Sequence, residues 1–276
     1  MVTKFVNGKW IKCSFGEIKA NAVICGDWLK VCKLFKKNVF DLVISSPPYN
    51  LGKEYEIEND FDFTDYLEWH SLLLQGCMRV LKNGGRLAWQ TGATRDGNNY
   101  FPLNSWVSMI CLRIGFSQRV EIVWNKNQIP KRTAWGSFQS PSNNNILPSY
   151  EYIELFSKGD KRIVKVGVPT ISKKDFVSWT NGLWNIKPET RFTKIHPSVF
   201  PEEIARRLIE LNTYKGGLVL DPLSGLGTVG VVAGMLGRRF IMIDSDLNYC
   251  FFSYDRMMES FELANKRIKV SIYRVV

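Results

Sequence analysis

The fold expected for this chain is decided by the stretch Asp41-Leu42-Val43-Ile44-Ser45-Ser46-Pro47-Pro48-Tyr49-Asn50. Its apolar start predicts a buried parallel strand, and the two prolines end that strand in a stiff loop, because proline fixes φ and has no amide hydrogen. Residues before a proline are extended, so the Ser46 hydroxyl and the Ser46 and Pro47 carbonyls can project from the strand's carboxyl end, where open α/β sheets bind ligands. The aromatic face of Tyr49 beside these acceptors suits a nucleobase. Taken alone, the motif is equally consistent with an ordinary turn.

A second apolar strand, 218–221, breaks into a glycine-rich turn that opens a helix. The turn reads Asp221-Pro222-Leu223-Ser224-Gly225-Leu226-Gly227-Thr228. Its glycines allow the backbone to approach a ligand, and the positive end of the following helix points to the same place. A further strand, 240–244, ends in Asp244, an acid positioned to accept hydrogen bonds from ribose hydroxyls. The three pieces together are far more specific than any one of them.

These motifs resemble those of the amino-group DNA methyltransferases that use S-adenosylmethionine. In that family a Ser/Asp/Asn-Pro-Pro-Tyr/Phe loop holds the target amino group, and an Asp-Pro-Phe-x-Gly-x-Gly-Thr loop holds the methionine part of the cofactor. The catalytic loop comes first here, as in the circularly permuted β subgroup, and the match extends over nearly the whole chain. The resemblance implies an α/β, Rossmann-like methyltransferase fold with a doubly wound, mostly parallel sheet, formed as a single catalytic domain over 1–276.

The resemblance also assigns the site residues. The catalytic set is Ser46, Pro47, Pro48 and Tyr49, and the cofactor-binding set is Asp27, Phe200, Asp221, Pro222, Ser224, Gly225, Gly227, Thr228 and Asp244. Asp27 follows the strand 22–25 and is expected either to contact the adenine of the cofactor or to cap the next helix, two readings of equal weight. Phe200 lies in a His-Pro-x-x-Phe-Pro segment and would pack on the cofactor. Leu223, where the family has an aromatic residue, and Asp244, where glutamate is common, are departures from the pattern.

A basic and aromatic segment from about 128 to 193 is the least family-like part of the chain. Basic side chains neutralise phosphates, and aromatic ones can wedge into a distorted duplex. We therefore predict a target-recognition insertion with its core at about 159–188, against the alternative of a solvated surface loop. The DNA-binding candidates are Lys131, Arg132, Lys161, Arg162, Lys173 and Lys174.

Other periodic segments fill in the expected fold. Asn7-Gly8 between apolar residues predicts a hairpin, and a polar loop is expected over 51–63. Helices are expected over 65–80, 101–115 and 202–211, and strands over 86–89, 116–124 and 149–156. His70 has no evident partner in its helix, so we expect a packed or solvated histidine rather than a catalytic one.

Composition limits the function classes. The 276 residues are 45% hydrophobic, enough for a large core, and the net charge of +11 favours a polyanionic partner. The six cysteines form no Cys-x-x-Cys pair, none follows a proline, and only two histidines are present, so neither a metal site nor the Pro-Cys nucleophile of cytosine-C5 enzymes is expected. With no apolar run near twenty residues, the expectation is a reduced, cytoplasmic protein without membrane contact.

The predicted reaction is methyl transfer from S-adenosylmethionine to the N4 amino group of cytosine in double-stranded DNA, because Ser-Pro-Pro-Tyr occurs mostly in cytosine enzymes of the resembled family. The alternatives are the N6 amino group of adenine, an RNA or protein-glutamine methyltransferase, and an inactive DNA-binding subunit. Transfer would follow extrusion of the target base, since its amino group is not accessible inside the duplex. A cognate restriction endonuclease is a candidate partner, and the oligomeric state stays open between monomer and homodimer.

Overall fold

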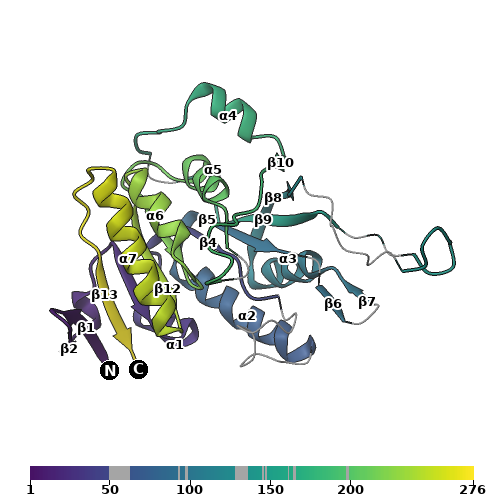
Figure 1. Ribbon diagram of the computed structural model, residues 1–276. Helices are drawn as coiled ribbons and strands as arrows, with labels where there is room; N and C mark the ends of the chain where they lie inside the picture. Colours follow the sequence, from purple (N-terminus) through teal and green to yellow (C-terminus); the bar gives the residue numbers. More distant parts are fainter. Residues whose placement is uncertain are drawn as a thin grey trace.

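The computed structural model describes residues 1–49, 63–92, 94–96, 99–127, 136–144, 146, 148–160, 162–163, 166–196 and 199–276. Within these ranges the chain forms an eleven-stranded sheet of order β10-β8-β9-β5-β4-β11-β12-β3-β13-β1-β2, together with a separate β6-β7 pair. Helices cover both faces of the large sheet (Figure 1). The expected α/β, doubly wound architecture is confirmed.

The strands are short, apolar runs where they are central. They span β1 Val2–Val6, β2 Lys9–Cys13, β3 Ala22–Cys25, β4 Phe40–Ser45, β5 Leu81–Thr91, β6 Thr94–Asp96, β7 Asn99–Phe101, β8 Phe116–Asn125, β9 Tyr150–Lys158, β10 Leu183–Asn185, β11 Leu218–Asp221, β12 Arg239–Asp244 and β13 Ser271–Val275. The strands β3 and β11 are buried at every position, as expected for parallel strands covered on both faces. In the large sheet, β9 is antiparallel to both β5 and β8, and β1 is antiparallel to β13 and β2; the other pairs are parallel.

The helices divide between the two faces. They span α1 Trp28–Leu34, α2 Phe63–Val80, α3 Leu103–Ile114, α4 Lys173–Trp179, α5 Glu202–Asn212, α6 Thr228–Met235 and α7 Leu247–Leu263, with a short 3-10 turn at Phe15–Glu17. Alternate residues of β4 point to opposite cores: Val43 packs with α1, α2 and α3, whereas Leu42 and Ile44 pack with α5, α6 and α7. This alternation is the period-two pattern of a strand buried on both sides.

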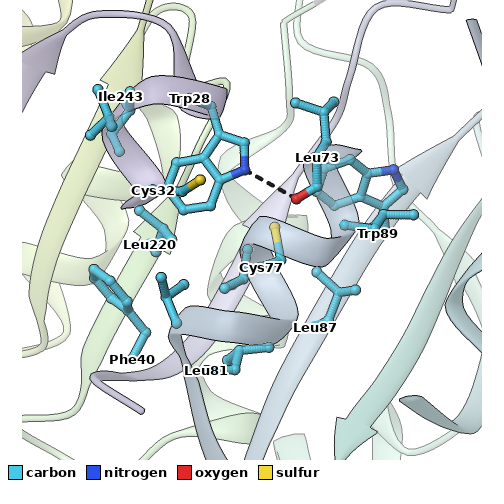
Figure 2. Packing of buried hydrophobic residues seen from close by; sticks show 14 of the residues in the cluster. Trp28, Cys32, Phe40, Leu73, Cys77, Leu81, Leu87, Trp89, Leu220 and Ile243 are labelled. Atoms are coloured by element: carbon cyan, nitrogen blue, oxygen red, sulfur yellow. Dashed lines mark hydrogen bonds between the residues drawn. The ribbon is translucent and has the colours of Figure 1, made fainter. Parts of the chain in front are cut away.

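The core on the α1–α3 face is built around two tryptophans. Figure 2 shows Trp28 of α1 and Trp89 of β5 among aliphatic and sulfur side chains, with the Trp28 indole N–H donating to the Leu73 carbonyl at 3.1 Å. His70 is buried beside them, and its Nε2 accepts a hydrogen bond from the Trp89 indole at 3.3 Å. Burial lowers the pKa of His70 to about 3, so the ring is neutral at physiological pH. The expectation of a packed histidine is confirmed.

One expected helix differs from the structure at its start. The predicted helix 101–115 begins at Leu103, because Phe101 pairs with Thr94 in the β6-β7 ladder and Pro102 precedes the first turn. The predicted hairpin is present, with positive φ at Asn7 and Gly8, as a tight turn requires. The expected loop 51–63 lies almost wholly outside the described residues. The chain ends meet, as the amino group of Met1 donates to the Val276 carbonyl (Figure 1).

The predicted insertion core, 159–188, contributes one helix and one strand. The helix α4 lies outside α5, where the Trp179 ring stacks under the guanidinium groups of Arg206 and Arg207, with charge-to-centroid distances of 5.0 and 5.4 Å. The strand β10 then extends the large sheet by pairing with β8. Among the described residues, no helix is both long and apolar enough to cross a bilayer.

Candidate active site

The carboxyl ends of β4 and β11 carry the two loops singled out in the sequence, and the structure joins them. The strands are direct neighbours in the sheet. Ser45, the last residue of β4, donates from Oγ to Oδ1 of Asp221 at 2.8 Å, and both side chains are buried. The residue before the Ser46-Pro-Pro-Tyr loop is therefore fixed relative to the first residue of the glycine-rich loop.

One pocket lies between these loops. Its lining residues are Ile44, Ser45, Ser46, His196, Val199, Phe200, Asp221, Leu223, Ser224, Gly225, Leu226, Thr228 and Val229. The predicted site residues that share it are thus Ser46, Phe200, Asp221, Ser224, Gly225 and Thr228. The Ser224 Oγ atom is buried without a hydrogen-bonding partner among the described residues, so it is free to bond a ligand.

Two acids stand behind the glycine-rich loop. Asp221 accepts from the Leu223 amide at 3.1 Å, and Asp244 accepts from the Gly225 amide at 2.7 Å and the Asp246 amide at 2.9 Å. Burial raises the pKa of Asp221 to about 7 and that of Asp244 to about 6. Asp221 lines the pocket and Asp244 does not. Nearby positive charge would favour the ionised form of Asp221, so the pocket suits a cationic ligand. The ribose-binding role of Asp244 stays a prediction. In this structure the carboxylate holds the glycine-rich loop through the Gly225 amide.

The catalytic loop is held from two sides. The Tyr66 hydroxyl of α2 donates to the Pro48 carbonyl at 2.6 Å. On the other side, Tyr49 is buried with its ring against Gly92, where a Cβ would come within 2.6 Å of the Tyr49 ring. The Cδ2–Cε2 side of the Tyr49 ring therefore leaves no room for a side chain at position 92, and stacking of a base on Tyr49 stays a prediction.

The Tyr49 hydroxyl belongs to a polar network at the same sheet edge. It lies 3.4 Å from Glu151 Oε2 of β9, 3.2 Å from the Gln90 amide of β5 and 3.4 Å from Ser46 Oγ. Glu151 also accepts from Gln90 and forms an ion pair with Lys126. Burial raises the pKa of the Tyr49 phenol well above its ordinary value, so the hydroxyl stays protonated and can donate to Glu151.

Asp27 does not line the pocket. Its side chain accepts from the Leu29 amide at 2.9 Å and caps α1, which is the structural alternative considered from the sequence. A cofactor contact by Asp27 stays a prediction. Pro47, Pro48, Tyr49, Pro222 and Gly227 also lie outside the set of lining residues and position their neighbours instead; Gly227, with φ of +73°, starts α6.

The predicted DNA-binding residues that the structure describes do not lie at this edge. Lys131, Arg132 and Lys161 lie outside the described residues. Arg162 packs by its carbonyl against Gly84, near the start of β5 and so at the opposite edge of the sheet. Lys173 and Lys174 (the α4 pair) are exposed and follow Thr170 closely in the sequence. Thr170 accepts a hydrogen bond from Arg238, which directly precedes β12 and so lies at the amino edge of the sheet. Figure 1 shows α4 on the far side of the molecule from the end of β13. Their contact with DNA stays a prediction that this placement does not favour.

Sequence reasoning missed several residues of the site. Ser45 and His196 line the pocket, while Tyr66, Gln90 and Glu151 support the catalytic loop. Gln90 and Glu151 each stand next to an end of a strand that contains other polar residues, so no sequence signal distinguished them. No group of three or more His, Cys, Asp or Glu side chains in the described ranges is arranged to hold a metal ion.

Comparison with known proteins gives a consistent result. The N6/N4 methyltransferase family model, described as DNA methylase, matches residues 40–254. The type II methyltransferase M.MjaVI of Methanocaldococcus jannaschii is 34% identical over 178 residues, which is 64% of this chain and 91% of M.MjaVI.

Solved structures share the fold. A putative DNA modification methylase from Thermus thermophilus, complexed with S-adenosyl-L-methionine, has a TM-score of 0.75 at 23% identity, with 91% of this chain and 97% of that chain covered. The PvuII DNA methyltransferase, described as cytosine-N4-specific, has a TM-score of 0.68 at 18% identity, with 91% and 94% covered.

Proposed function

This chain belongs to the N6/N4 methyltransferase family of DNA methylases, and we propose that it methylates the N4 amino group of cytosine in duplex DNA. Family membership makes it a DNA amino-methyltransferase that uses S-adenosylmethionine; the choice of base is the proposal. The observation that carries the proposal is the shared pocket, in which Ser46 and the glycine-rich loop meet and are tied together by the Ser45–Asp221 hydrogen bond.

The residues of the pocket fit this cofactor. When bound, S-adenosylmethionine supplies a methyl group on a positively charged sulfur, which leaves as a neutral thioether. Asp221 provides a buried carboxyl that favours a cationic ligand, Ser224 offers an unbonded hydroxyl, and Phe200 an apolar face. The glycine-rich loop and the start of α6 bring backbone amides to the same pocket. These are the residues that would hold the cofactor.

The Ser46-Pro-Pro-Tyr loop would bind the target amino group. An exocyclic amino nitrogen is a poor nucleophile because its lone pair is delocalised into the ring. The Ser46 hydroxyl and the Pro47 carbonyl would each accept one amino hydrogen, which favours a pyramidal nitrogen with its lone pair available for reaction. Ser46 lines the pocket, so the amino group it binds would lie beside the cofactor, and alignment of the two reactants supplies much of the rate.

Cytosine is preferred over adenine because of Ser46. A neutral hydroxyl is a weaker acceptor than the carboxylate of an Asp-Pro-Pro-Tyr loop, so serine suits an amino group that needs less activation. The proposal assigns this lower requirement to the N4 amino group of cytosine. The N6 amino group of adenine is the alternative, since it also stands next to a ring nitrogen. The PvuII enzyme, described as cytosine-N4-specific, shares the fold and supports the first choice at the level of fold alone.

The DNA would approach the carboxyl edge of the sheet, where the pocket opens. The chain that leaves β10 at this edge carries the exposed residues Lys187, Arg191 and Lys194, which we call the edge cations. They lie between β10 and the pocket residue His196 in the sequence and can neutralise phosphates beside an extruded base. A cognate endonuclease is proposed as a partner because M.MjaVI is named a type II methyltransferase.

The decisive experiment incubates the protein with unmethylated duplex DNA and methyl-labelled S-adenosylmethionine, followed by mass spectrometry of the nucleosides. We expect N4-methylcytosine. Finding N6-methyladenine alone would overturn the base and keep the site, whereas no transfer to any DNA would overturn the function. Ser46→Ala should abolish most transfer while cofactor binding by calorimetry is retained; a fully active variant would remove Ser46 from the reaction.

A further inference from the structure

A short segment of the chain ends at the pocket. We call residues 189–196 the strap. Its last residue, His196, lines the pocket, its ring lies 5.2 Å from that of Tyr249 on α7, and its Nε2 would be 3.7 Å from a Cβ placed at Gly225. Within the strap, the amides of Ile195 and His196 both donate to the Phe192 carbonyl at 2.9 Å. The strap is therefore a folded turn that contacts the pocket at its end.

An ion cluster connects the strap to the glycine-rich loop. Arg256 of α7 is 8% exposed and donates through Nη1 to the Leu226 carbonyl and to Thr228 Oγ1, both at 3.0 Å. Its Nη2 donates to Glu202 Oε1 at 2.8 Å, and Arg191 of the strap donates to the same oxygen at 3.1 Å. One carboxylate thus joins two guanidinium groups that would otherwise repel each other.

A cation–π contact also joins the strap to the cluster. The Phe192 ring of the strap covers the Arg256 guanidinium at 4.5 Å from the ring centroid, an arrangement in which the cation faces the ring. Movement of the strap away from the pocket would remove the Phe192 ring from the nearly buried charge of Arg256. It would also separate Arg191 from Glu202, which would keep only its bond to Arg256.

The pocket is small while the strap is in this position. Its volume is about 60 Å³, and three of its lining residues, His196, Val199 and Phe200, belong to the strap or follow it. Sites for drug-sized ligands measure roughly 300–1,000 Å³. A ligand as large as S-adenosylmethionine therefore requires the strap side of the pocket to move outward before the ligand enters.

We infer that Glu202 and Arg256 are positioning residues that latch the strap against the glycine-rich loop, and that this latch controls the entry and release of the cofactor. The latch acts through Arg191 and Phe192, which hold His196 at the pocket. Its relevance to the cofactor rests on the proposed function, since the ligand of the pocket is taken to be S-adenosylmethionine. The latch itself is a property of the chain without ligand.

The test variant is Glu202→Gln, and its matched control is Glu203→Gln. Both residues are in the first turn of α5 with similar exposure, 41% and 37%, but Glu203 pairs with Arg207 at 2.9 Å and does not contact the strap. The first measurement is hydrogen–deuterium exchange of a peptide covering the strap, without cofactor. Faster exchange in Glu202→Gln alone supports the latch, and unchanged exchange overturns it. This result does not depend on the identity of the ligand.

The second measurement is stopped-flow binding of S-adenosylmethionine. Loss of the latch should raise the dissociation rate constant about tenfold, the factor for one charge-assisted hydrogen bond, without lowering the association rate constant. Unchanged rate constants in Glu202→Gln would refute control of the pocket by the latch. Failure of the wild-type chain to bind S-adenosylmethionine would instead refute the proposed function.

A further variant guards against loss of folding in Glu202→Gln. Arg191→Gln removes the strap side of the pair at a side chain that is 61% exposed, together with the Arg191–Glu189 ion pair inside the strap, and should accelerate strap exchange in the same way. If Arg191→Gln folds and exchanges as slowly as the wild type, the latch is refuted.

Discussion

Replacing Asp221 by asparagine should stabilise this protein at neutral pH while weakening its cofactor site. The two hydrogen bonds described for the carboxyl, from Ser45 and from the Leu223 amide, both end on Oδ1. An asparagine with its oxygen in that position keeps both bonds. The variant therefore removes the buried charge and leaves the connection between the two loops in place.

The size of the effect follows from the pKa. Burial raises the pKa of Asp221 from 3.8 to about 7, so between these pH values the folded chain holds a proton that the unfolded chain has lost. The free energy of unfolding consequently falls as pH rises from about 4 to 7, by about 1.4 kcal/mol per pH unit and ~4 kcal/mol in total. Asparagine is uncharged in both states. The stability of Asp221→Asn relative to wild type should therefore grow from about zero at pH 4 to ~4 kcal/mol at pH 8.

Urea unfolding followed by tryptophan fluorescence, at pH values from 4 to 8, measures this difference. Asp244 titrates in both proteins, so its contribution largely cancels. The control is Asp255→Asn, which removes an exposed carboxylate of α7 by the same chemical change. Cofactor affinity at pH 8 should fall about tenfold in Asp221→Asn, because a charge-assisted interaction is lost. A stability difference that stays constant or declines with rising pH would show that the pKa of Asp221 is not raised in the folded chain.

Three further predictions test other parts of the site. Replacing Lys187 and Lys194 by glutamine should reduce the slope of log DNA affinity against log salt by about 0.9 for each lost phosphate contact. The same change to the α4 pair tests the DNA-binding role predicted from the sequence. An unaltered slope in that second variant would remove the α4 pair from the interface. Tyr66→Phe deletes the donor to the Pro48 carbonyl and should lower single-turnover methylation about tenfold with cofactor affinity unchanged, whereas equal loss of both would indicate a general structural defect. Asp27→Ala should lose about 1 kcal/mol of stability through its helix cap, and Asp27→Asn should retain it; weaker cofactor binding in both variants would establish the cofactor contact.

The local structure of the site could be predicted from the sequence. Strand 41–44 and the loop after it follow from an apolar run and two prolines, and the glycine-rich turn follows from residues within one short stretch. Such features depend on the φ preferences and burial of adjacent residues. The resemblance to amino-group DNA methyltransferases rested on these same local motifs, and the family match confirmed it.

The contacts between distant segments were decided by the tertiary structure. Tyr49 meets Glu151 across 102 positions of sequence because β9 enters the sheet antiparallel beside β5, and no local pattern specifies that order. The same reason decides where the basic segment lies: charge and aromatic content predict an interface, which stays a prediction, and the path of the chain puts the α4 pair at the opposite edge from the catalytic loop. The local sequence determines which residues form a strand or a turn. Which strands become neighbours depends on the crossovers that order them in the sheet, and that order is set by the packing energy of the whole sheet.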